Sequence, residues 1–545
     1  MDAKQLVELA TELFTKKQPL TSLHQEIADN FYPERADFTI MRSMGTDFAA
    51  NLMSSYPVQC RRELGNQFST MLRPTARPWF HPRQRYKKKA SADVQGYLEW
   101  FEETQRRAMY DPAAMFTRAT KEGDHDYAAF GQCAISIELN KHANGLLYRC
   151  WHLRDMCWQE NDEGKLGFIG RKWKPRARDL KNLFKDKVHE KVAKAADKTP
   201  FEEMEVRHLV VDAEMYDDKS MGRPRWSIYY DVTHDCLIEA TPIWGRHYVI
   251  PRWQTVSGSQ YSYSPATVCA LPDARLLQAM TYTLLEAGEK ATSPPVIATQ
   301  DAIKSDVALY AGGITWVDME YDERLGDALR PLTQDFRGFN YGVQMNQDTR
   351  AMLARAFFLD TLKLPANGPE MTAYEVGQRV QEYIRGALPI FEPTEMEYNA
   401  AICDETFEIL QRNGAFGAPG SWPKELRGAD IDFTFESPLH DVIEQQKGQK
   451  FQEAQQLIAS AMALDQSAQF VPNSIVALRD ALQGIGVPAT WMNSQAEVEQ
   501  KSADAQAQAQ SQQRLANMEQ ASNAVKNIGM SGMTPSQGAM SPTAA

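Results

Sequence analysis

The stretch Tyr248–Pro295 decides the fold: YVIPRWQTVSGSQYSYSPATVCALPDARLLQAMTYTLLEAGEKATSPP. An apolar run ends at Pro251, and the segment Gly258–Pro265 combines glycine, serine, tyrosine and proline, which exclude a regular helix or a central strand. Pro272 suits the first turn of a helix, leucines then recur at helical spacing, and two adjacent prolines end the pattern. The stretch therefore predicts a strand, an ordered loop and a helix over 272–292. It holds no group typical of catalysis.

A second long helix is expected over 343–363, after a short β-rich segment. That segment contains the apolar run GGITWV (312–317) and a charged loop at Asp322–Arg330. Two long helices that leave a body and return to it form an antiparallel pair, with the insert at the far tip. Apolar positions on the second helix spread wider than one stripe, which is typical of packing against both the first helix and a neighbouring copy. A helix buried in a monomeric core is the alternative.

The residues before this stretch predict a mixed α+β body. An amphipathic helix over 2–30, broken near Pro19, precedes helices over 58–72 and 91–122. From Cys133 the apolar residues alternate, which predicts half-buried strands. These strand signals fall at 133–139, 148–151, 166–171, 208–211, 226–231 and 247–250, with one basic helix over 176–187.

The C-terminal part alternates loops and helices. A loop with two prolines and a glycine spans 364–370. Patterns for two helices, a strand and a further helical region follow at 371–386, 393–413, 431–435 and from Leu439. From Ser494 the composition becomes rich in glutamine, alanine, serine and methionine. Such a segment cannot bury a core alone, so it is either a helix supported by neighbouring copies or disordered.

Composition excludes some classes of function. The net charge is −12, whereas a protein that grips duplex phosphates is usually basic, so a sequence-reading DNA-binding protein is not expected. A channel through which DNA must slide has no such need, because tight phosphate binding would stall the DNA. The 7 cysteines are scattered from Cys60 to Cys403, which suits a reducing cytoplasm. No apolar run approaches a bilayer span and no signal peptide is recognisable, so no membrane contact is expected.

Three local patterns invite a chemical interpretation, and each has a structural alternative. Arg73–Lys89 mixes cations with aromatic residues, which suits nucleic acid, although a buried Pro-Trp-Phe anchor before a solvated loop is favoured. The basic run Arg171–Lys187 is expected to face mainly water. Asp124-His125-Asp126 has residue types that bind metals, but neighbours on a helix point to different faces and cannot converge on one ion.

No sequence motif for catalysis is present. The chain has no phosphate-binding glycine loop that ends in Lys-Ser or Lys-Thr, no dinucleotide fingerprint, no serine elbow and no zinc-protease motif. The sequence therefore predicts no enzyme, with no catalytic residue, cofactor or metal ligand.

Short blocks along the chain occur in the order of a known family. Besides Tyr248–Pro295, they are FYPERADFT (31–39), GNQFSTMLRPTARPWF (65–80), DHDYAAFGQCAISIE (124–138), GKLGFIGRKWKPRARDL (164–180), GGITWV (312–317), MTAYEVGQRVQEYIR (371–385) and ILQRNGAF (409–416). On these blocks the chain resembles the head-to-tail connecting proteins, or portal proteins, of short-tailed bacteriophages, over roughly residues 5 to 465. No single block is as specific as a metal-ligand pattern, but their shared order is hard to produce by chance.

The resemblance implies an α+β, portal-type fold that forms a ring. Its parts would be a mixed α/β wing, a two-helix stem, a small β-rich clip insert, a tunnel loop, a helical crown and a C-terminal barrel helix. In chain order these are the wing 1–269, stem helix 270–292, clip 293–339, stem helix 340–363, tunnel loop 364–370, wing 371–438, crown 439–493, and barrel helix or disordered tail 494–545.

The resemblance also implies a function. A ring of about twelve copies would sit at one capsid vertex of the virion, after synthesis in the host cytoplasm. Double-stranded DNA would pass through it without sequence specificity during packaging, retention and ejection. The ring would dock the packaging terminase, tail adaptor proteins, and the major capsid and scaffold proteins. A monomeric tail adaptor, or a hydrolase with an unrecognised carboxylate site, is the alternative.

Within this scheme the sequence suggests residues for three surfaces. Phe357 would lie at a subunit contact. The channel residues would be Arg350, Arg355 and Lys363. Ion pairs of the two arginines with Asp348 or Asp360 are an equal alternative to a guiding role. The clip residues that would dock tail or terminase proteins are Asp322, Glu323, Arg324, Asp327 and Arg330.

Overall fold

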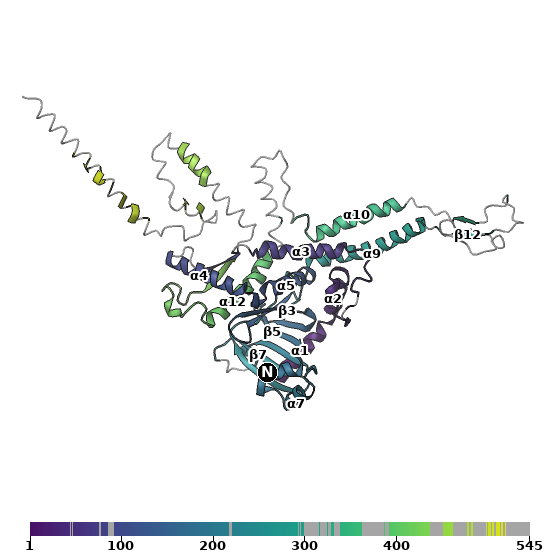
Figure 1. Cartoon of the computed structure of the whole chain (residues 1–545), viewed down its shortest axis with the longest axis horizontal. Coiled ribbons are helices and arrows are strands. Elements are labelled where there is room, and N and C mark those ends of the chain that lie inside the picture. Colours follow the sequence, from purple (N-terminus) through teal and green to yellow (C-terminus); the bar gives the residue numbers. More distant parts are fainter. Residues whose placement is uncertain are drawn as a thin grey trace, which may run out of the picture. The chain divides into compact units, whose positions relative to one another are not determined.

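Figure 1 shows the computed structural model of the chain. The described residues are 1–43, 45, 47–75, 78–85, 92–216, 221–292, 294, 296–298, 316, 324, 329–331, 338–361, 386, 392–435, 451–460 and short groups between 477 and 518. Nearly all of the expected helix 371–386, the tunnel loop, most of the clip and crown, and the end of the tail therefore lie outside the described residues.

The chain divides into two compact units. One comprises Met1–Arg85, Leu98–Trp422 and Arg427–Ile443, and the other comprises Tyr86–Tyr97, Pro423–Leu426 and Glu444–Ala545. Both of the larger sheets belong to the first unit. In the second unit, residues 451–460 are helical.

A five-stranded antiparallel sheet, ordered β4-β5-β6-β7-β8, forms one part of the first unit. Its strands are β4 (Met156–Glu160), β5 (Leu166–Trp173), β6 (Val206–Asp212), β7 (Arg225–Asp231) and β8 (Cys236–Ile243), and the helices on it are α1 (Ala3–Lys16), α6 (Ala177–Phe184) and α7 (Glu190–Lys198). Side chains alternate between the two faces of a strand. Leu209 and Val211 of β6 therefore pack with α1, whereas Val206 packs with α6 and α7.

Local signals explain where the first two helices begin. In α1 the carboxylate of Asp2 accepts from the backbone N–H of Gln5 at 2.8 Å, and the Gln5 side chain accepts from the N–H of Asp2 at 3.0 Å, which is a capping box. Helix α2 (Gln18–Phe31) carries Pro19 in its first turn, where a missing N–H costs nothing. Lys17 joins the two helices, so the expected break near Pro19 is confirmed.

A second antiparallel sheet has the order β3-β2-β9 and lies among helices. The elements are β2 (Ala134–Leu139), β3 (Leu146–Trp151), β9 (Tyr248–Val249), α3 (Tyr56–Leu72), α4 (Ala92–Met109), α5 (Phe116–Phe130) and α12 (Ala400–Arg412). The hydroxyl of Tyr248 is 2.5 Å from Nδ1 of the buried His208, a bond that links this sheet to the five-stranded one. A further antiparallel pair joins β1 (Phe80–Gln84) to β14 (Ile431–Phe435), segments that are far apart in the sequence.

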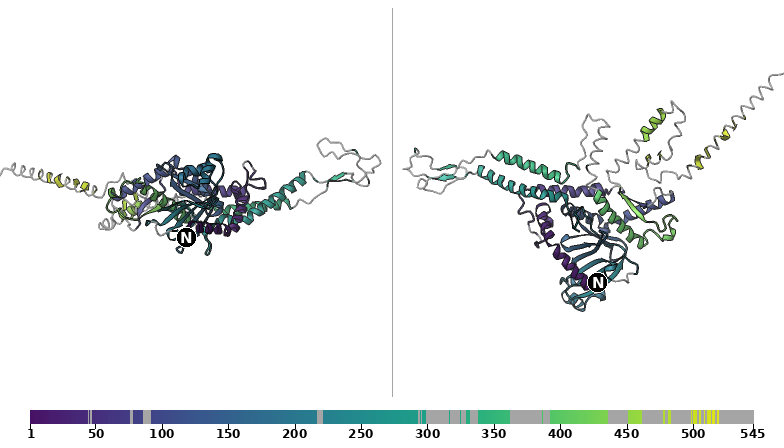
Figure 2. Two further views of the ribbon diagram at one scale, coloured as in Figure 1. Left: turned by 90° about the horizontal axis from the view of Figure 1, so that it is seen from below. Right: turned by 180° about the vertical axis from the view of Figure 1, so that it is seen from behind.

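Two helices that extend from this body, α9 (Pro265–Thr292) and α10 (Phe339–Ala356), run side by side (Figures 1 and 2). Between them, β12 (Val296–Ala298) pairs with β13 (Leu329–Pro331) in antiparallel register. We call α9, β12, β13 and α10 the arm. Within the part of the chain that the structure describes, no helix combines the length and apolar character that a membrane span requires.

The mixed helix and sheet content expected from the sequence is confirmed, but several boundaries differ. Helix α9 begins at Pro265 rather than near Pro272, which lies inside it. The earlier start is stabilised by tertiary contacts, since the Thr267 hydroxyl donates to the carbonyl of Ala129 at 2.7 Å. Helix α10 ends at Ala356 rather than at 363, and Phe358 then adopts a left-handed φ of 58° that a helix cannot continue through. Strands β1, β4 and β8 were not expected from the sequence.

Candidate functional site: the two-helix arm

The two helices of the arm meet along a seam of small and polar side chains. The Asn346 amide of α10 donates to the Thr281 hydroxyl of α9 at 3.1 Å. Gly342 lies against Leu284, and a Cβ at this position would come within 2.9 Å of the leucine Cδ2. Thr349 and Leu353 are buried. A larger residue at 342 would therefore require the Leu284 side chain to shift.

The base of the arm is tied to the body by polar contacts. The side chain of Gln278 accepts from the backbone N–H groups of Met53 and Ser54, both at 2.8 Å, and donates to the Ser54 carbonyl at 2.9 Å. Arg275 donates to the carboxylate of Glu26 on α2 at 2.7 Å. The segment before α3 and the helix α2 thus hold α9 at two separate places.

The outer surface of the arm carries large apolar side chains in contact with solvent. Tyr341 is 75% exposed, Tyr282 57% and Leu285 55%. Other apolar residues of the two helices that are exposed are Val268, Leu276, Phe339, Val343, Met345 and Met352. Monomeric proteins seldom expose apolar surface at this density, and such surfaces commonly mark sites of protein association. We call these nine residues the apolar arm surface.

The residues expected in a channel are only partly described. Arg350 and Arg355 are both exposed on α10. The Arg350 guanidinium lies over the ring of Tyr56, 5.6 Å from its centroid. Among the described residues, Arg350 and Arg355 form no ion pair with Asp348 or Asp360. Lys363 lies outside the described residues, so the channel role stays a prediction.

The expected docking residues of the clip are less completely described. Arg324 is exposed, and Arg330 lies in β13 opposite Ile297 of β12. Asp322, Glu323 and Asp327 lie outside the described residues. The antiparallel β12–β13 pair does show that a β-structured segment joins the two helices of the arm.

Phe357 is not placed where the sequence suggested. Its side chain is 0% exposed, and its ring lies 5.4 Å from that of Phe31 on α2. A side chain that is fully covered inside the protomer has no surface to offer to a neighbouring copy. The expected subunit contact at Phe357 is therefore replaced by a core contact, because the turn after α10 directs the ring into the body rather than along the helix.

The acidic motif of α5 is also structural, as the sequence favoured. Arg73 pairs with Asp124 in the core, donates to Asn399 Oδ1 at 2.7 Å and lies 4.7 Å from the centroid of the Tyr398 ring. Burial raises the pKa of Asp124, and Arg73 opposes this shift. The pairing is invisible in the sequence, since the arginine and its two partners come from three separate segments.

The residues that follow Asp124 on α5 are in different environments. Asp126 accepts from Arg35 at 2.7 Å, and burial lowers the pKa of His125 to about 4. Across the described residues, no group of three or more histidine, cysteine, aspartate or glutamate side chains is placed to hold a metal ion.

The Pro-Trp-Phe anchor favoured for Arg73–Lys89 is confirmed where it is described. Trp79 and Phe80 are buried, and the indole N–H of Trp79 donates to the hydroxyl of Tyr110 at 3.0 Å. Arg83 pairs with Asp432 across the β1–β14 ladder at 3.1 Å. The role of this stretch is therefore structural, because it joins parts of the chain that are far apart in the sequence.

Two of the cavities that the described residues of the body form are small. One of about 320 Å³ is lined by residues of α5 and β3, including Arg118, Glu122 and Trp151. The other, of about 230 Å³, lies between Trp244-Gly245-Arg246 and α12. The Glu405 carboxylate beside the second cavity already accepts from the backbone N–H groups of Arg246 and His247, at 2.8 and 3.0 Å. Its role is thus to hold a turn.

Comparisons with known proteins identify relatives of this chain. The family model of bacteriophage head to tail connecting proteins matches residues 3–492. The probable portal protein of Bordetella phage BPP-1 is 24% identical over 458 residues, which are 80% of this chain and 79% of that protein. The portal protein of Salmonella phage epsilon15 is 24% identical over 251 residues, which are 43% of each chain.

Solved structures give weaker matches. A chain from the virion of a native gene transfer agent particle is 12% identical with a TM-score of 0.36, covering 82% of this chain and 95% of that chain. A chain from the neck of an empty gene transfer agent particle, with the same identity and coverage, has a TM-score of 0.34. Scores this low do not establish a shared fold. The match of the family model over most of the sequence does establish kinship: the chain belongs to the family of bacteriophage head to tail connecting proteins.

Proposed function

We propose that this chain is the subunit of a portal ring at one vertex of a phage capsid. The observation that carries the proposal is the apolar arm surface. Covering this surface with a neighbouring copy removes apolar side chains from water, which favours association. Burying a single leucine or methionine side chain contributes roughly 1.5–3 kcal/mol. Several such side chains on each arm therefore suffice to hold neighbouring copies together.

The positions of the apolar residues support a ring. They occur on both α9 and α10 and not only along their seam. An arm placed between two neighbouring arms would cover both helices, and identical head-to-tail contacts close into a cyclic assembly. The family's usual number of copies, about twelve, is the expected size.

The ring would enclose a channel for double-stranded DNA. The net charge of −12 suits a passage that does not grip phosphates. Arg350 and Arg355 are exposed on α10, and with Lys363 they would supply the few cations that guide the duplex without sequence specificity. DNA packaging, retention and ejection would all use this passage.

The distal end of the arm would serve as the docking platform. A β-structured segment carried on two paired helices is presented away from the body, and loops on a rigid scaffold commonly carry binding. The charged clip residues would contact the packaging terminase and later the tail adaptor proteins. The body would face the major capsid and scaffold proteins, in a virion assembled after synthesis in the host cytoplasm.

Negative-stain microscopy together with sedimentation velocity tests the proposal. The purified chain is expected to form rings with a central hole. Leu285→Asp and Tyr341→Asp should lower the ring fraction by placing an uncompensated charge in the contact. Leu237→Asp is the matched control, since Leu237 is a 44% exposed leucine on β8 outside the arm.

The outcomes separate this function from its alternatives. Monodisperse monomers of the unaltered chain would overturn the ring and favour a monomeric tail adaptor. Rings that assemble normally in both arm variants would show that the apolar arm surface is not the subunit contact. Hydrolytic activity lost on substitution of a carboxylate would favour the enzyme.

A further inference from the structure

Two adjacent large apolar side chains project from the segment between α2 and α3. Ile40 is 55% exposed and Met41 is 88% exposed. Scattered apolar residues on a surface are ordinary, but two neighbouring ones on a backbone that is held in place are not. We call Ile40 and Met41 the knob.

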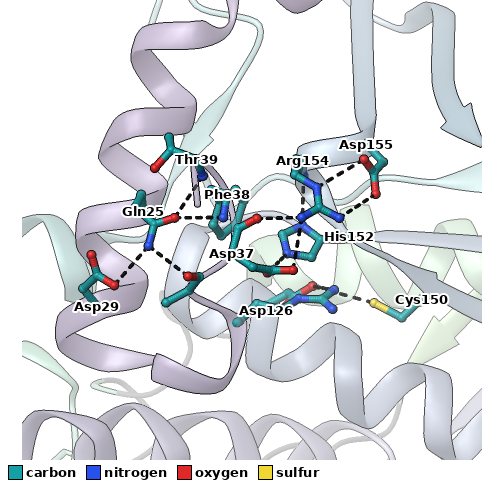
Figure 3. A network of polar contacts seen from close by, with 12 residues as sticks. Gln25, Asp29, Asp37, Phe38, Thr39, Asp126, Cys150, His152, Arg154 and Asp155 are labelled. Atoms are coloured by element: carbon teal, nitrogen blue, oxygen red, sulfur yellow. Dashed lines mark hydrogen bonds and ion pairs between the residues drawn. The ribbon is translucent and has the colours of Figure 1, made fainter. Parts of the chain in front are cut away.

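A buried glutamine holds the backbone on the N-terminal side of the knob (Figure 3). Oε1 of Gln25 accepts from the N–H groups of Phe38 and Thr39, at 2.8 and 3.0 Å. Its Nε2 donates to the carbonyl of Ala36 at 3.0 Å. Gln25 is only 7% exposed, so these bonds are shielded from water and hold the turn firmly.

The residues just before the knob are also fixed. The Asp37 carboxylate is 2.6 Å from Nε2 of His152 and 3.1 Å from Nη1 of Arg154, which also donates to the Asp37 carbonyl at 2.7 Å (Figure 3). The ring of Phe38 is buried and lies 4.6 Å from His152 and 5.0 Å from Phe130. The chain therefore enters the knob from a rigid base.

The C-terminal side of the knob is joined to the same network. Arg42 donates to Asp29 Oδ1 at 3.0 Å, the oxygen that also accepts from Gln25 at 3.0 Å. One carboxylate thus connects both sides of the knob, and it is paired with the charge of Arg42, the residue next to Met41. The Arg42 guanidinium also lies over the ring of Phe48 at 5.5 Å. The result is an uncharged apolar projection on a preorganised turn.

The segment that carries the knob ends at the base of the arm. Met53 and Ser54, at its far end, are the residues that Gln278 of α9 holds. The knob and the apolar arm surface are therefore connected through one loop, whose far end is held by Gln278.

We infer that the knob of one copy docks on the apolar arm surface of the next copy. The inference rests on the proposed ring and identifies its second contact surface. A head-to-tail ring needs two different complementary surfaces on each subunit. The knob suits this role because it is apolar, lacks an unpaired charge and loses little conformational freedom on binding. An acidic or basic partner would find no opposite charge on it.

Mixing two defective variants tests the pairing. Met41→Glu removes the knob and Leu285→Glu removes the arm surface, so each alone should lower the ring fraction at least about tenfold at a fixed concentration. An equimolar mixture retains one intact contact, between the knob of the Leu285 variant and the arm of the Met41 variant. The mixture should therefore form dimers in sedimentation velocity, whereas neither variant alone does.

Controls keep the test decisive. Met221→Glu is matched to Met41→Glu, because Met221 is an 86% exposed methionine outside the knob and the arm, and it should assemble normally. Unchanged thermal unfolding of each variant confirms that folding is intact.

Each remaining outcome overturns the inference. Normal rings of Met41→Glu would show that the knob is not a subunit contact, and failure of those rings to enter capsids would assign it to a capsid partner. A mixture that stays monomeric would show that the knob of one copy does not bind the arm surface of another copy. An unaltered chain that stays monomeric would overturn the ring itself.

Discussion

The ring of Phe357 lies 5.4 Å from the ring of Phe31, and this contact fastens the residue after α10 to the last residue of α2. Both side chains are fully buried. The position at which the chain leaves the arm is thus a core position of the body. Substitutions there are expected to act on the folding of the protomer first and on assembly only as a consequence.

Phe357→Ala should therefore destabilise the unassembled protomer. Truncating a buried phenylalanine costs about 3–5 kcal/mol, because apolar contacts are lost and a cavity remains. Urea denaturation measures the change. Phe339→Ala is the control, since Phe339 begins α10 and is 38% exposed. Equal stability of the two variants would contradict the core assignment of Phe357.

Removing only one partner of the buried Arg73–Asp124 pair should lower the free energy of unfolding strongly. Asp124→Leu leaves the arginine charge without its partner, and the expected loss of unfolding free energy is about 3–5 kcal/mol. Adding Arg73→Met to this variant should restore much of the lost free energy of unfolding. The exposed pair Arg107–Glu103 provides the comparison, and Glu103→Ala should change stability by less than about 1 kcal/mol. A double variant as unstable as Asp124→Leu would count against this account.

Stability should rise with pH through the titration of Lys17. Its ammonium is buried between the carbonyls of Leu153 and Met156, at 2.7 and 2.8 Å, and burial lowers its pKa to about 8. The folded state therefore disfavours the charged form. The penalty is present below pH 8 and disappears as the pH rises toward the ordinary lysine value of 10.5.

Urea denaturation at pH 7.5 and pH 9.5 measures this effect. The free energy of unfolding should increase by about 2 kcal/mol over that interval. Lys17→Met, which cannot titrate, should lack the increase, although it loses the two hydrogen bonds. A variant with the same pH dependence as the unaltered chain would exclude Lys17 as the source.

The clip should be dispensable for the ring and needed for attachment of the tail. Reversing the charges of Asp322–Arg330 leaves the apolar arm surface untouched, so rings should form. Capsids that carry the variant should lack tails in electron micrographs, and a lower DNA content would show that the same charges also contact the terminase. Normal infectivity would remove these charges from the docking site.

Charge reversal in the channel should slow DNA without affecting assembly. Arg355→Glu and Lys363→Glu are expected to lower the packaging rate, because added negative charge repels the duplex. Raising the salt concentration should weaken the difference through screening. Arg178→Glu, at an exposed position of α6 outside the arm, is the control for packaging rate. Unchanged rates at low salt would take both residues out of the channel.

The sequence by itself determined the elements that have a strong local pattern. Alternation and helical spacing are local, so strands β5, β6 and β7, the break near Pro19 and the two arm helices could all be predicted. The order of the short blocks was sufficient to indicate the family. Neighbouring positions on α5 point to different faces, an argument that needs only helix geometry, and the structure gives Asp124 and Asp126 separate arginine partners.

Only the tertiary structure decided what depends on distant contacts. The partner of β1 lies in β14, more than three hundred residues away, and no local pattern records such pairing. The start of α9 depends on Ala129, the burial of Phe357 depends on Phe31, and the exposure of Met41 depends on the network around Gln25. Periodicity shows which residues are apolar, but whether an apolar residue lies in the core or at the surface is decided by the segments that fold against it.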